Sequence, residues 1–293
     1  MFGSIQELVA LAQEGQCPLW QVMLRQEAEV TGRGEEEILR EMAASYRVMK
    51  EAAAKGIRGV TTHSGMCGGD AKRLFDYLKN GRILSDETLL KAACYAIATN
   101  EVNAAMGRIC ATPTAGSAGI LPGVMLAMQE KLGLPDETIV RHLFTAGAIG
   151  LVIANRACIS GAAGGCQAEI GSASAMAAAA VTELAGGTPG QAAHAMALAL
   201  KNMLGLACDP LAGLVEVPCI KRNAAGAANA LAAAEMALAG LRSHIPPDEV
   251  ISALYAIGLS MPLALRETAQ GGLAATPTGQ RWKKLLWQGR DTD

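Results

Sequence analysis

The chain has few aromatic side chains and almost no net charge. Phe, Trp and Tyr make up 3% of its 293 residues, and 25 basic against 27 acidic side chains leave a formal net charge of −2. Such a chain lacks the basic surface by which proteins bind nucleic acid, so we expect no nucleic-acid partner. Hydrophobic residues make up 51%, with abundant alanine and glycine. This composition predicts a core of helices that small side chains allow to pack closely.

Long apolar runs and a targeting signal are also missing. No uninterrupted apolar stretch reaches the roughly 20 residues that a membrane-spanning helix needs, although the mean hydropathy is +0.24. The N-terminus, Met1–Gln6, has neither the basic start nor the apolar run of a signal peptide. We therefore expect a soluble, cytoplasmic protein without membrane contact. In that compartment, eight cysteines indicate reduced thiols or metal ligands rather than disulfides.

The sequence shows no alternating strand pattern, no fixed internal repeat and no composition break that would mark a linker. Caps, prolines and glycines instead predict helices. We place them at 4–15, 18–32, 35–55, 71–79, 86–106, 135–156, 168–185, from 188 onward, 223–239 and 246–267. This pattern predicts one all-α domain over residues 1–293. Its parts would be a packing or subunit-contact layer at 1–56, the functional site within 57–279, and a short tail at 280–293.

Three cysteines occupy glycine-rich or proline-broken segments between residues 161 and 223. Cys166 ends the run Gly161-Ala-Ala-Gly-Gly, Cys208 precedes Asp-Pro, and Cys219 follows Val-Pro. Loop-to-helix junctions of this kind expose unpaired amides, and thiolates form there more easily than in mid-helix. Three such thiols would suit an iron–sulfur cluster with one open iron. Cysteine is also a common buried packing residue and no Cys-x-x-Cys pair is present, so spacing alone favours packing.

Two further loops could orient a small polar substrate. Residues 63–70 are glycine-rich and lead into a predicted helix N-terminus, an arrangement that can bind an anion such as a carboxylate. Residues 112–119 combine hydroxyl side chains with exposed amides. Taken alone, the first loop is more readily explained as a tight turn. The second is equally well explained as a capped helix connector.

Four stretches together resemble the iron–sulfur-dependent L-serine dehydratases, specifically the alpha subunit of the two-chain bacterial form. They are Asn100–Gly119, Ile159–Gly171, Leu204–Asn223 and Arg266–Leu273, within a likeness that runs from about 63 to 279. The resemblance implies an all-helical catalytic domain. In it, three cysteines would hold a [4Fe–4S] cluster, and by motif they are Cys166, Cys208 and Cys219.

The resemblance also implies the reaction, deamination of L-serine to pyruvate and ammonia. An open iron would act as a Lewis acid on the serine hydroxyl while a base removes the α-proton. Loss of water would leave aminoacrylate, which hydrolyses. Candidate substrate-binding residues, chiefly for the carboxylate, are Ser64, Gly65, Thr114, Ser117, Gly271 and Gly272. Lys221 is a candidate catalytic residue that could stabilise charge near the cluster, and an ion-pair or surface role is given equal weight.

The resemblance to the two-chain form implies a separate beta subunit, in an αβ or α2β2 hetero-oligomer. Single-chain relatives carry an extra N-terminal domain that corresponds to this subunit, so the general base is expected to lie on the partner. Three alternatives remain: a related [4Fe–4S] hydro-lyase for another small hydroxy acid, an electron-transfer protein, and a non-catalytic helical scaffold. An electron-transfer cluster would normally use four protein thiolates.

Overall fold

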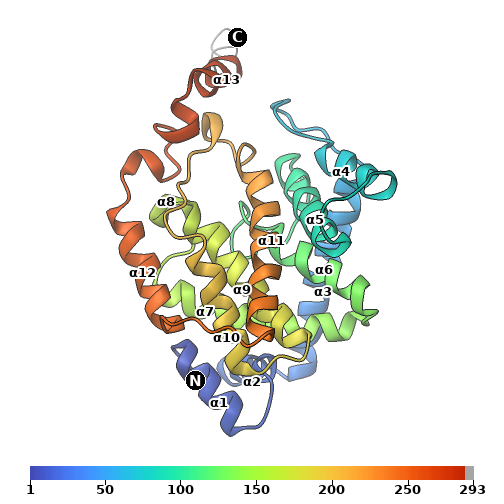
Figure 1. Ribbon diagram of the computed structural model, residues 1–293, viewed down its shortest axis with the longest axis vertical. Helices are drawn as coiled ribbons and strands as arrows, with labels where there is room; N and C mark the ends of the chain where they lie inside the picture. Colours follow the sequence, from blue (N-terminus) through green and yellow to red (C-terminus); the bar gives the residue numbers. More distant parts are fainter. Residues whose placement is uncertain (288–293) are drawn as a thin grey trace.

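The computed structural model describes residues 1–287, and within them the chain is all-helical, as predicted (Figure 1). The one β-type pairing in the described part is an isolated parallel bridge between Cys208 and Arg266. Its elements run from α1 at the N-terminus to α13 near the C-terminus, with short 3₁₀ and π turns between some of them.

The first three helices make up the N-terminal layer. They are α1 (Ile5–Glu14), α2 (Leu19–Thr31) and α3 (Glu35–Ile57), and α2 packs on both α1 and α3. Their limits follow the predicted signals: the Ser4 hydroxyl accepts a hydrogen bond from the Glu7 amide, and Gly32 ends α2 with a left-handed φ of +67°. Helix α2 packs on α7 (Asp136–Arg156) and α3 packs on α5 (Glu87–Ala104). The layer thus has a packing role, while its subunit-contact role stays a prediction.

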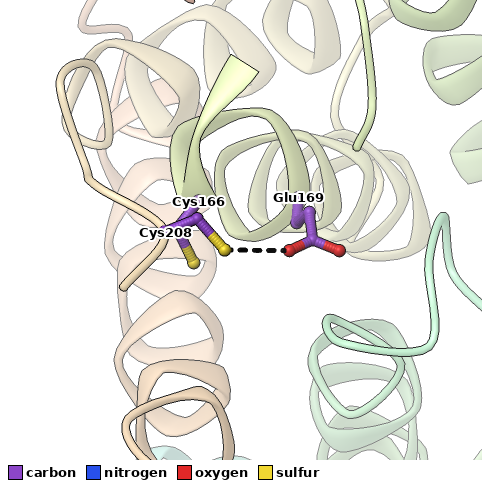
Figure 2. Close-up of side chains that lie close together, drawn as sticks. All are labelled: Cys166, Glu169 and Cys208. Atoms are coloured by element: carbon purple, nitrogen blue, oxygen red, sulfur yellow. Dashed lines mark hydrogen bonds between the residues drawn. The ribbon is translucent and has the colours of Figure 1, made fainter. Parts of the chain in front are cut away.

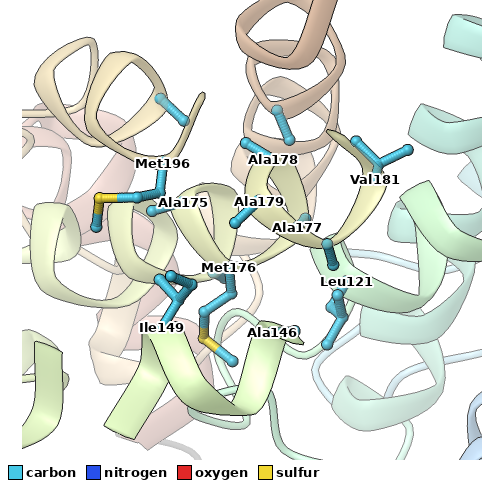
Figure 3. Close-up of a cluster of buried hydrophobic side chains, with 14 of the residues drawn as sticks. Leu121, Ala146, Ile149, Ala175, Met176, Ala177, Ala178, Ala179, Val181 and Met196 are labelled. Carbon is cyan, nitrogen blue, oxygen red and sulfur yellow. The ribbon is translucent and has the colours of Figure 1, made fainter. Parts of the chain in front are cut away.

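Helix α9 (Ser172–Leu184) is the centre of the core. It is surrounded by α6 (Ile120–Leu132), α7, α10 (Pro189–Lys201) and α11 (Cys219–Leu238). Nearly every residue of α9 is buried, and Figure 3 shows its alanines facing side chains of α6, α7 and α10. Small residues make this possible because they let helix axes approach. Where α6 crosses α5, a Cβ on Gly123 would lie 2.6 Å from the Ala92 carbonyl oxygen, so only glycine fits.

Helix α7 is the one described helix that is long and apolar enough to cross a membrane by length and composition. Its most apolar window is 61% buried inside the protein, where α7 packs against α9 and α2. The core helix of a globular protein has this burial pattern, and α7 fits it.

Four predicted features were wrong in detail. Helix α6 was not predicted, because Pro122 and Gly123 interrupt its pattern. Helix α11 begins at Cys219 rather than 223, and α12 (Pro247–Ser260) ends seven residues before the predicted limit of 267. The extended ψ of 131° at Met261, directly before Pro262, ends α12. The expected tail at 280–293 is helical to Trp287 within α13 (Pro277–Trp287), and residues 288–293 lie outside the described part.

Candidate metal and substrate site

Two of the three predicted ligand thiols meet beside a buried carboxylate. The Sγ atoms of Cys166 and Cys208 and a carboxylate oxygen of Glu169 all lie within 4.8 Å of one another (Figure 2). The Cys208 thiol donates a long hydrogen bond of 3.9 Å to Oε2 of Glu169. Cys166 is 2% exposed, Cys208 1% and Glu169 9%, so the group is shielded from water. All eight cysteines are free thiols.

Local structure explains how Cys166 and Glu169 come to face the same way. Cys166 directly precedes a π-helical turn, Gln167–Gly171, which continues into α9. Turns of this type are rare in proteins, and those that occur are often found at functional sites. Cys166, directly before this turn, and Glu169, within it, reach the same group of ligand atoms.

Gly161, at the start of the short helix α8 (Gly161–Gly164), leaves room for the second thiol. A Cβ there would lie 2.7 Å from both Cys208 Sγ and Glu169 Oε2, and 3.1 Å from Oε2 of Glu267. The backbone at Gly161 therefore approaches a thiol and two carboxylates so closely that a side chain does not fit.

The segment from Cys208 to Cys219 connects the other loops of the site. Two backbone hydrogen bonds join Cys208 to the segment after α12. The Cys208 amide donates to the Leu265 carbonyl oxygen (2.8 Å), and the Glu267 amide donates to the Cys208 carbonyl oxygen (2.7 Å). Glu267 has a φ of +62°, a strained value for a residue other than glycine. Asp209 accepts a hydrogen bond of 2.8 Å from the Leu273 amide. Both sides of this segment are thus fixed by specific contacts.

The third predicted ligand, Cys219, is the first residue of α11 and is 6% exposed. It lies outside the compact group of ligand atoms formed by Cys166, Glu169 and Cys208. Asn223, one turn further along, donates to the carbonyl oxygens of Cys219 (2.9 Å) and Gly116 (2.8 Å) and accepts from the Gly119 amide (3.0 Å). One buried amide side chain thereby joins the Cys219 turn to the loop at 112–119.

The thiols do not share one electrostatic environment. A hydrogen bond from Cys208 and the positive charge of Arg222 lower the pKa of Cys166, against the opposing effect of burial. The pKa of Cys208 is raised by its interaction with the neighbouring Cys166 and by burial. Burial, followed by the nearby negative charge of Cys166, raises the pKa of Cys219. Without a bound cation, Cys166 is therefore the thiol that ionises first.

Glu169 is the main residue that the sequence analysis did not single out. Its Oε1 accepts a hydrogen bond of 2.6 Å from the Thr114 hydroxyl. Burial raises the pKa of Glu169, although the hydrogen bond from Thr114 opposes the shift. The available signal was its position three residues after Cys166, inside a motif already quoted. Arg222 and Glu267 were present in quoted motifs in the same way.

The candidate substrate-binding residues fall into three places. Thr114 and Ser117 lie together at Glu169, with 3.0 Å between their hydroxyl oxygens, and Ser117 is fully buried. The Ser64 hydroxyl donates to Glu216 (2.6 Å) in the Cys208–Cys219 segment and accepts from the Met66 amide (3.0 Å). Gly65, between Ser64 and Met66, has a φ of +71°. The first pair is thus brought to the thiols, whereas the Ser64 loop is anchored to the connecting segment.

Gly271 and Gly272 lie on the Asp209 side of the site. A Cβ on Gly272 would be 2.3 Å from Oδ2 of Asp209, and the φ of Gly272 is +56°. Both the lack of room and the left-handed backbone therefore require glycine at this position. A Cβ on Gly271 would be 2.8 Å from the Ala264 carbonyl oxygen.

Lys221 points away from the thiols toward the other loop. Its Nζ lies 2.7 Å from Oδ2 of Asp70, and its side chain is 64% exposed. The hydrogen bond to Asp70 raises the pKa of Lys221, which keeps it protonated. This ion pair is the second of the two roles that the sequence analysis considered, and the catalytic role stays a prediction.

Comparison with known proteins agrees with this geometry. The serine dehydratase alpha chain family matches residues 14–274. The chain is 59% identical over 289 residues to the probable L-serine dehydratase, alpha chain, of Bacillus subtilis, covering 99% of this chain and 96% of that protein. It is 44% identical to the L-serine dehydratase, alpha chain, of Peptoniphilus asaccharolyticus, covering 97% and 98% of the two chains. The L-serine dehydratase of Streptomyces coelicolor is 40% identical over 92% of this chain but only 59% of its own length. The chain therefore belongs to the serine dehydratase alpha chain family, whose members are lyases.

Proposed function

We propose that this chain is the alpha subunit of an iron–sulfur-dependent L-serine dehydratase, which converts L-serine to pyruvate and ammonia by α,β-elimination. The observation that carries the proposal is the buried group of Cys166, Cys208 and Glu169. It lies in the region matched by the family and is contacted by Thr114, from one of the loops predicted to bind the substrate. Relatives named L-serine dehydratase support the choice of substrate.

The residues fit a [4Fe–4S] cluster by the chemistry of their donors. Iron–sulfur clusters are held by cysteine thiolates, and here two buried thiols lie together while a third, Cys219, is close enough to be affected by the charge of Cys166. Gly161 leaves free the space next to Cys208 that any side chain would fill. Cys166, Cys208 and Cys219 are the proposed ligands. When bound, a cluster with one open iron supplies a Lewis acid for the departure of the serine hydroxyl.

The remaining residues of the site are proposed to bind and orient serine. Thr114 and the amides of Gly271 and Gly272 are candidate donors to its carboxylate. Glu169 offers a buried acceptor for its ammonium group, at the point where the loop at 112–119 reaches the thiols. Ser117 is fully buried against Thr114 and orients that hydroxyl. Ser64 and Gly65 hold their loop against Glu216.

The general base is proposed to lie on a beta subunit. The relatives named alpha chain imply such a partner, and the longer Streptomyces coelicolor enzyme contains sequence beyond the part that this chain matches. We further propose an αβ or α2β2 assembly in the cytoplasm. Lys221 is tied to Asp70 on the exposed side, so it is the weaker candidate for proton transfer.

The proposal is tested by co-expressing the chain with a beta subunit, purifying the complex without oxygen, and measuring iron content and pyruvate formation from L-serine. About four irons per alpha chain with serine turnover are expected. Changing Cys166, Cys208 or Cys219 to Ser should remove both, whereas Cys94→Ser, at a fully buried cysteine of α5, should keep the iron. Iron without serine turnover would point to another hydroxy acid. A complex without iron would contradict the proposal and favour a scaffold role.

A further inference from the structure

Arg222 is a partly buried cation that joins the helix of Cys219 to the segment of Cys208. It lies on α11, three residues after Cys219, and its side chain is 19% exposed. Its Nη1 donates to the Ala207 carbonyl oxygen (2.7 Å), directly before Cys208. Its Nη2 lies 2.9 Å from Oδ1 of Asp209. The planar guanidinium group of Arg222 is therefore held by contacts on both sides of Cys208.

The charges around the thiols explain why a cation is needed there. The carboxyls of Glu169, Glu267 and Asp209 lie against the thiols or beside them. Cluster formation adds three thiolates to this region. Arg222 brings a positive charge into this region, on the helix that begins with Cys219 and in contact with the residues on either side of Cys208. Lys221, the residue before Arg222, is paired with Asp70 on the exposed side.

We propose that Arg222 is a positioning residue for the iron–sulfur cluster: it holds the Cys208 segment against the helix that begins with Cys219 and makes the cluster easier to reduce. This inference rests on the proposed function. Cluster potentials depend on net charge and on hydrogen bonds to sulfur, and a guanidinium supplies both. Asp209 orients the guanidinium and partly neutralises it, so these two residues should act on the potential in opposite directions.

The test is a redox titration of the oxygen-free αβ complex, followed by the electron paramagnetic resonance signal of the reduced cluster. Removing the guanidinium in Arg222→Gln should disfavour reduction by about tenfold, which is about 59 mV for one electron. Asp209→Asn keeps an acceptor for the Leu273 amide but removes a negative charge. It should favour reduction by a similar factor. Arg222→Lys keeps the charge without the planar guanidinium, so its potential should return most of the way toward that of the unchanged protein.

Lys131→Gln is the matched control, because it removes an exposed cation at the far end of α6 and should leave the potential unchanged. If Arg222→Gln does not retain the cluster, Asp209→Asn and Arg222→Lys still decide the matter by the sign of their shifts. Equal potentials in Arg222→Gln, Asp209→Asn and the control, with iron and serine turnover intact, would overturn the inference about Arg222 alone. An unchanged protein that binds no iron would instead contradict the proposed function.

Discussion

Replacing Gly161 by alanine should separate assembly of the site from folding of the chain. The new Cβ would lie 2.7 Å from Cys208 Sγ and Glu169 Oε2, and 3.1 Å from Glu267 Oε2. Contacts below 3.0 Å force atoms to move, and Cys208 cannot move freely because backbone hydrogen bonds hold it on both sides. The added methyl group would therefore displace a proposed ligand thiol and the carboxylate beside it.

The cost to folding should be small by comparison. Overpacking a buried site costs about 1–3 kcal/mol. Alanine at a helical position in place of glycine returns roughly 0.5–1 kcal/mol, and Gly161 begins α8 without a positive φ. The net loss should therefore be about 0–2.5 kcal/mol, or several degrees in the melting temperature of the metal-free chain at most. Iron binding should fall much further, to a small fraction of the unchanged value.

The assay compares melting temperature by circular dichroism with iron per chain after oxygen-free reconstitution. Gly147→Ala is the matched control, because a Cβ at Gly147 in α7 would meet nothing within 4 Å. That change should keep iron binding and slightly raise stability. If Gly161→Ala binds as much iron as Gly147→Ala, the space at Gly161 is not part of the metal site and our interpretation of it is wrong.

Three further predictions concern single contacts. Asn223→Ala removes three buried hydrogen bonds and should lower the free energy of unfolding by about 2–4 kcal/mol in a urea titration, while Asn223→Asp, which turns a buried carboxylate toward the carbonyl oxygens of Gly116 and Cys219, should lose at least as much at neutral pH. The pKa of Glu169 in the folded chain is raised above its ordinary value of 4.5, so ionising it costs stability as pH rises from that value. The metal-free Glu169→Gln variant should therefore gain in melting temperature over the unchanged chain between pH 4 and 7, and a constant difference would contradict this. Lys221→Met breaks an exposed ion pair and should change stability by less than about 1 kcal/mol, so a loss of kcat of tenfold or more would show that Lys221 has a catalytic role after all.

The sequence was most informative where a short-range rule controls the backbone. The Asp86 carboxylate accepts from the amides of Thr88 and Leu89, and Thr188 forms the predicted capping box with Gln191, so both helices begin where predicted. Helix α6 escaped prediction because it is buried around most of its circumference and contains a proline and a glycine. Its close crossing with α5 stabilises it, and that contact is tertiary.

In the candidate site too, some features follow from local sequence and others depend on tertiary contacts. Cysteines in unusual loop settings could be recognised from sequence, because residue type and local chemistry identify them. The approach of Glu169, Glu267 and Arg222 to the thiols could not be predicted, since it depends on how segments far apart in the chain cross. The meeting of Cys208 with Glu267, for example, requires that the chain return after α12 to form a single bridge.

Helix α9 physically links this site to the N-terminal layer. The π turn that leads into its start contains Glu169 and directly follows Cys166. At its other end, Glu183 is 7% exposed, accepts from the amide of Leu19 in α2 and accepts from the hydroxyl of Thr145 in α7. Between these ends the helix is mostly alanine, which packs closely but offers little side-chain shape to fix its rotation or register. The polar contacts at both ends must supply that precision, because an unpaired buried carboxylate is costly. The N-terminal layer therefore helps to set the position of Cys166 and Glu169, although none of its residues lies in the site.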